Sequence, residues 1–135
     1  MKHIKTYEGF KTPNKEIFDT MKDILLDLED DGYHVSFSNS DGVNLNRLAF
    51  IPPLKDMIVT VCTWHGSMDN WRESIKSFEY SEIKDVFYRL IVYMMSEGYG
   101  FKISFSEVES NWVVVDDAIT NGIEGKHDYY RILFI

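Results

Sequence analysis

The chain has 135 residues, of which 44% are hydrophobic and 27% are charged, a composition typical of one globular domain and not of a disordered segment. Its formal net charge of -8 disfavours general binding to nucleic acid, because phosphates would be repelled. A single cysteine, no signal-peptide pattern and no membrane-length apolar run together predict a cytoplasmic protein with no membrane partner.

The first predicted element is a helix that begins at Thr12 and Pro13, residues that suit an N-cap and a first helical turn. Apolar residues then recur at helical spacing as far as Gly32, which supplies the left-handed residue that ends a helix. Predicted strands follow at 33–37, about 44–51 and about 57–63, the last two joined by a turn at Pro52 and Pro53.

The next segment, residues 64–79, is predicted to be a long irregular connection. It has no counterpart later in the chain, and long loops of this kind often carry function.

A second helix is predicted from Glu82 to its ending at Gly98, because residues 82–99 repeat the pattern of residues 16–33 without a gap. Strands are then predicted at 99–105, about 111–115 and about 128–134, with a glycine-rich loop at 121–125. The identical pairs, each 66 residues apart, are Glu16 and Glu82, Ile17 and Ile83, Asp19 and Asp85, Gly32 and Gly98, and Tyr33 and Tyr99.

We therefore predict one α+β domain, residues 1–135, built from two αβββ repeats at about 12–63 and about 80–135 that are related by a pseudo-two-fold axis. Its sheet would have six mostly antiparallel strands with both helices on one face. The third strand of each repeat is apolar on both sides, so the two should meet at the axis. If each half is a meander, the strand order is 1-2-3-6-5-4, and a ferredoxin-like interleaving is the alternative. The predicted helical core residues are Ile17, Met21, Ile24, Leu25, Leu28, Ile83, Phe87, Leu90, Ile91 and Met94.

No spacing in the sequence predicts an enzyme, a metal site or a cofactor. The histidines are scattered, and the glycines form neither a P-loop nor a GxGxxG motif. Cys62 and His65 have the residue types of a nucleophile and its base. Cys62, however, lies in the apolar run IVTVC, which favours a buried, inert thiol and leaves a small hydrolase as an alternative only.

Two groups of residues are candidate binding surfaces. The first lies at the connection after the strand at 57–63, which supplies Trp64, His65, Trp71 and Arg72, and the strand at about 128–134 could add Tyr130 or Arg131 beside it. Aromatic walls and directed polar groups would suit a small ligand or a protein anchor there. The alternative is that both tryptophans pack under the sheet edge. The second is an acidic stripe at helical spacing on the first helix, which would dock a basic partner or simply be solvated; its residues are Asp19, Asp23, Asp27 and Asp30.

The second helix is apolar beyond its core stripe, at Tyr88, Val92, Tyr93 and Met95. So wide an apolar arc indicates a second contact, either with a loop or with another subunit, and we favour a homodimer.

The N-terminal residues Lys5-Thr6-Tyr7-Glu8-Gly9-Phe10 resemble the capsid-targeting leader of internal head proteins of large tailed phages. The resemblance implies phage origin. A packaged family member would also carry a protease site of the type Leu-x-Glu or Ile-x-Glu, and no such triplet occurs in this sequence. We therefore expect a non-enzymatic phage accessory protein that binds a host protein or a small host signal molecule. An internal virion or prohead component is the second hypothesis.

Overall fold

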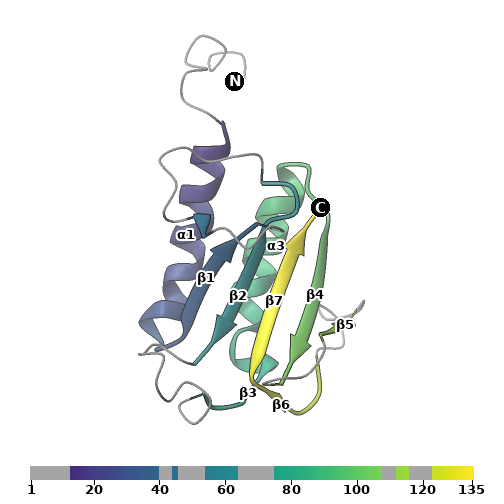
Figure 1. Cartoon of the computed structure of the whole chain (residues 1–135). Helices are drawn as coiled ribbons and strands as arrows, with labels where there is room; N and C mark the ends of the chain where they lie inside the picture. Colours follow the sequence, from purple (N-terminus) through teal and green to yellow (C-terminus); the bar gives the residue numbers. More distant parts are fainter. Residues whose placement is uncertain (1–12, 40–43, 46–53, 64–74, 108–111, 116–122) are drawn as a thin grey trace.

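The structure is a computed structural model, and it describes residues 13–39, 44–45, 54–63, 75–107, 112–115 and 123–135. Within these ranges two α-helices accompany a five-stranded antiparallel sheet and a separate two-stranded ribbon (Figure 1). The predicted α+β class is confirmed. Neither described helix is long and apolar enough to cross a membrane.

The described elements follow the predicted sequence of helices and strands with shifted boundaries. In chain order they are α1 (Pro13–Asp30), β1 (His34–Ser38), β2 (Ile58–Cys62), β3 (Phe78–Glu79), the 3-10 helix η4 (Tyr80–Glu82), α3 (Lys84–Ser96), β4 (Phe101–Ser106), β5 (Val113–Val115), β6 (Lys126–His127) and β7 (Tyr129–Phe134). Of the strand predicted at 44–51, Asn44 forms an isolated bridge with Ser38, and residues 46–51 lie outside the described residues.

The prediction that residues 64–79 are irregular throughout is wrong at the end of the segment. Phe78 and Glu79 form β3, which pairs antiparallel with β6. The physical reason is an aromatic anchor: the Phe78 ring contacts Tyr130 at 4.9 Å between centroids, and the Tyr130 hydroxyl donates to the Phe78 carbonyl at 2.6 Å.

Both α-helices end in the same hydrogen-bonded motif. At the end of α1 the Tyr33 amide donates to the Leu28 carbonyl at 3.0 Å, and Gly32 has φ of +98°. At the end of α3 the Tyr99 amide donates to the Met94 carbonyl at 3.0 Å, and Gly98 also has φ of +98°. A Schellman ending needs this left-handed residue, so the glycines have the predicted role.

The five strands lie in the order β1-β2-β7-β4-β5 (Figure 1). The predicted meeting of the two third strands is confirmed, since β2 pairs with β7. The meander order is wrong: β1 pairs directly with β2, and β4 lies between β7 and β5. β4 and β7 pair along six residues, whereas β5 has only three and is exposed at Val113 and Val114. The longer strand, which also has more buried residues, therefore takes the inner position. Among the described strands the two halves are not interleaved either.

One core fills the space between the helices and the sheet. Figure 1 shows α1 and α3 side by side behind the strands, and the two helices contact each other. Along each strand, residues that point into the core alternate with residues that point away from it, and in β1 the buried residues are Val35 and Phe37. Nine of the ten predicted helical core residues are buried, and Ile24 is partly buried.

Candidate functional site

The second face of the five-stranded sheet, which we call the open face, is turned away from both helices. In Figure 1 the strands lie in front of the helices, so the open face points toward the viewer. The strand registers place one row of residues straight across the middle of this face. The row consists of Ser36, Thr60, Arg131, Ser104 and Val114.

The five strands of this sheet contain no aspartate or glutamate, although the chain has 22 acidic residues and a net charge of -8. The open face carries two permanent cations in these strands, Lys102 and Arg131. Acidic residues instead concentrate on the helical side, above all along α1. The open face is therefore the part of the described surface best suited to meet negative charge.

Arg131 lies in the centre of the open face, with Thr60 across one strand boundary and Ser104 across the other. Its Cζ atom lies 3.9 Å from the centroid of the Trp112 ring, a close cation–π contact. The Trp112 ring lies 6.0 Å from that of Tyr129. Arg131 is thus a cation with the flat aromatic rings of Trp112 and Tyr129 beside it.

The guanidinium of Arg131 is partly removed from water. Its Nε atom is buried and has no hydrogen-bond partner. Burial lowers the pKa of Arg131 below its usual range, because the charged form loses hydration. The neighbouring Ser104 and Ser106 are also buried. A desolvated cation binds an opposite charge more strongly than a fully hydrated cation does.

The structure separates two of the predicted site residues. Tyr130 is fully buried on the core face, whereas Arg131 lies on the open face, because neighbours in a strand point to opposite sides. Burial raises the pKa of the Tyr130 hydroxyl. These two side chains therefore do not share one pocket. Trp64, His65, Trp71 and Arg72 lie outside the described residues.

Trp112 was not among the predicted site residues. The signal was present in the alternation of residues 111–115: extending the β4–β5 register by one pair sets Trp112 across from Ser106, on the same face as Arg131. Finding it from the sequence would have required knowing that β4, and not β5, is the neighbour of β7.

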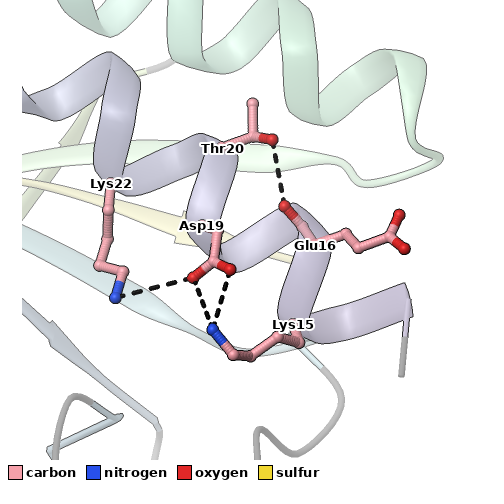
Figure 2. A network of polar contacts seen from close by, with 5 residues as sticks. All are labelled: Lys15, Glu16, Asp19, Thr20 and Lys22. Carbon is pink, nitrogen blue, oxygen red and sulfur yellow. Dashed lines mark hydrogen bonds and ion pairs between the residues drawn. The ribbon is translucent and has the colours of Figure 1, made fainter. Parts of the chain in front are cut away.

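The acidic stripe on α1 is partly neutralised by the chain itself. Figure 2 shows Asp19 between Lys15 and Lys22, with Nζ–O distances of 2.8 and 3.8 Å. The hydrogen bond from Lys15 lowers the pKa of Asp19. Asp27 accepts from Arg89 of α3 at 2.6 Å, whereas Asp23 and Asp30 are exposed. Two of the four carboxylates thus have partners within the fold.

His127 and Glu107 form a close polar contact. His127 Nδ1 contacts Glu107 Oε2, and Nε2 lies 2.9 Å from the Glu124 carbonyl. The ring packs on Phe105, with 3.9 Å between centroids. These contacts tie β6 to the end of β4 and to the core, so the pair holds the ribbon in place.

Cys62 is buried and lies across from His34 in the β1–β2 register. Its predicted partner His65 lies outside the described residues. Within the described ranges no three His, Cys, Asp or Glu side chains gather as a metal site requires.

No family model, no curated protein and no solved structure matches this chain.

Proposed function

We propose that this chain is a non-enzymatic phage-type accessory protein that binds a host protein or a small host signal molecule, in a counter-defence role, through the open face of its sheet. The observation that supports this proposal most directly is the Arg131–Trp112 contact at the centre of a face whose strands carry no carboxylate. A cation and flat aromatic groups on a rigid central strand can fix the orientation of a partner.

Affinity capture tests this function. The tagged chain is incubated with bacterial lysate, and captured proteins and extracted small molecules are identified by mass spectrometry. We expect a partner that is retained by the parent chain and lost from a variant that combines Trp112→Ala with Arg131→Ala. Arg89→Ala removes the same charge from an exposed helix position and should retain the partner. A partner retained equally by the double variant would remove the open face as the site.

The second candidate function is an internal virion component, favoured by the leader-like residues Lys5 to Phe10. Mass spectrometry of purified virions separates the two functions. A packaged protein would be found inside the head at a reproducible copy number, and an accessory protein would be found only in infected cells.

We also propose that the two halves are repeats related by a pseudo-two-fold axis between β2 and β7. The Schellman endings at Gly32 and Gly98 support it, since their hydrogen bonds correspond atom for atom. Strand registers support it too: Val35 pairs with Val61, and Ile103, in the corresponding place, pairs with Ile132. The axis would then pass through the Thr60–Arg131 pair.

An axis through the Thr60–Arg131 pair would make these two residues equivalent positions of the two repeats. Only one of the two is a cation, so the fold would offer a single cationic centre. We therefore expect one ligand to bind per chain. The proposal fails if the helix-turn-strand units at 16–38 and 82–106 do not superpose in an experimental structure.

A further inference from the structure

We infer that the open face binds a small planar anion, a flat ring that bears one carboxylate or phosphate group, against Arg131, Trp112 and Tyr129. The inference rests on the proposed binding function and narrows it to a chemical class of ligand.

The charge of the open face favours an anionic group in the ligand. Arg131 is the central cation of a face whose strands contain no acid, and no ion pair joins it to another residue of the described ranges. Its buried Nε has no acceptor, and a buried donor left unpaired is unfavourable because it has lost its hydrogen bonds to water. Carboxylate and phosphate oxygens match the fork of N–H donors on a guanidinium.

Neighbouring hydroxyls add to the anion site. Thr60 pairs with Arg131 across the strand boundary, and Ser36 pairs with Thr60 in the next strand. Both residues are partly exposed. A hydroxyl group can turn its hydrogen toward an anion, so the row would present further donors to an oxygen held by Arg131.

The aromatic side chains of the open face favour a planar ring in the ligand. Trp112 and Tyr129 lie with centroids 6.0 Å apart and an interplanar angle of 48°, and both are partly exposed. The Arg131 guanidinium, itself planar, already lies over the Trp112 ring. A flat ligand gains stacking against these surfaces, which a compact ion such as inorganic phosphate does not.

A small ligand is favoured over a polyanion by the charge of the whole molecule. At physiological ionic strength, charges interact over a Debye length of about 8 Å, so a small anion at the open face senses mainly Arg131 and Lys102. A nucleic acid or an acidic protein extends past the face and meets a chain of net charge -8. Binding of such a macromolecule in place of a ring anion is an outcome of the test.

Calorimetric titration of the full chain at low salt tests the inference. The probes are nucleoside monophosphates and indole-3-acetate as ring anions, adenosine and indole as neutral rings, and inorganic phosphate and acetate as bare anions. We expect at least one ring anion to bind more tightly than its neutral ring and its bare anion. Binding of the monophosphates alone identifies the phosphate source, and binding of indole-3-acetate alone identifies the carboxylate source.

Substitutions assign the site. Arg131→Ala should weaken binding about tenfold or more, the loss expected for one charge-assisted hydrogen bond. Trp112→Ala should weaken it as well, and Arg131→Lys should lie between Arg131→Ala and the parent. Arg89→Ala is the matched control and should change the affinity less than about twofold. Circular dichroism will show whether Arg131→Ala folds. If it does not, the affinity of Arg131→Lys, compared with that of the parent chain, tests the site instead.

The inference is overturned if no ring anion binds, if neutral rings or bare anions bind as tightly as ring anions, if a polyanion binds instead, or if Arg89→Ala loses as much affinity as Arg131→Ala. If the lysate experiment still yields a partner that depends on Arg131 while no ring anion binds, the proposed function stands and only the ligand class is wrong. If both experiments are negative, both proposals fail.

Discussion

Leu25 and Leu26 are adjacent leucines with opposite environments. Leu25 is 1% exposed in the core and Leu26 is 49% exposed. Helical spacing alone distinguishes them, because the apolar stripe of α1 passes through residues 21, 25 and 28. This residue-scale division was fully predictable from the sequence, since it depends only on periodicity.

Leu25→Ala should lower the free energy of unfolding by about 2–5 kcal/mol, because it leaves a cavity in the core. Leu26→Ala is its matched control and should change that free energy by less than about 0.5 kcal/mol. Ile91→Ala on α3, at 0% exposure, should lower the free energy of unfolding by an amount similar to that for Leu25→Ala. Chemical denaturation measures all three variants. An effect of Leu25→Ala or Ile91→Ala as small as that of Leu26→Ala would reject the assignment of the core stripe.

Glu82 gives a residue-scale dependence on pH. Its carboxylate accepts from the Tyr33 hydroxyl at 2.7 Å and from the Glu79 amide at 3.0 Å. The Tyr33 hydrogen bond, followed by the amide, lowers the pKa of Glu82 from its ordinary value of 4.5. A lowered native pKa means that the stabilisation is complete above the unfolded pKa and is lost as the pH falls through the native pKa.

Tyr33→Phe should therefore be less stable than the parent chain at neutral pH, and the difference should shrink in acid, below about pH 4.5. Denaturation curves over a series of pH values measure this difference. Tyr88→Phe, on an exposed tyrosine of α3, should show no such trend. A Tyr33→Phe difference that grows as the pH falls would contradict the assigned hydrogen bond.

At the scale of elements, the helices and most strands were predictable, and their lateral order was not. The glycines and the spacing of apolar residues define where α1 and α3 end, because those signals are local. Strand order depends on which edges meet in space. β4 and β5 both suit a neighbour of β7 by composition, and the length of the β4–β7 ladder decides between them only after folding. Because the strand order could not be predicted, Trp112 was missed as a neighbour of Arg131, although Arg131 itself was predicted.

The contact between α1 and α3 includes one ion pair, Arg89 with Asp27, at 2.6 Å. Both side chains are more than half exposed, at 52% and 59%, so solvent screens the pair. A double-mutant cycle with Arg89→Ala and Asp27→Asn should give a coupling free energy below about 1 kcal/mol, and added salt should reduce it. The cycle of Arg89→Ala with Asp23→Asn is the control and should show no coupling. A coupling above about 2 kcal/mol would make this pair a principal link between the helices.

At the scale of the whole molecule, charge and exposed apolar area are unevenly distributed. The helical side carries the acids of α1, and the sheet carries none. The outer surface of α3 nevertheless exposes Tyr88, Val92 and Met95, each about half. Tyr93, predicted to belong to the same arc, is partly buried against the core. The remaining residues lie at i, i+4 and i+7 and form one stripe, which is the geometry of a helix–helix contact.

We expect this stripe to support a homodimer whose strength rises with salt. Burial of the stripe favours association, while the charge of -8 on each chain opposes it, and salt screens the repulsion. Light scattering at high micromolar concentration should show more dimer at about 1 M salt, where the Debye length is about 3 Å, than at about 0.1 M, where it is about 10 Å. Val92→Asn should shift the chain toward monomer. Leu26→Asn, at an equally exposed position on α1, should not. A monomer at both salt concentrations, or the same loss of dimer with both substitutions, would show that α3 does not mediate self-association.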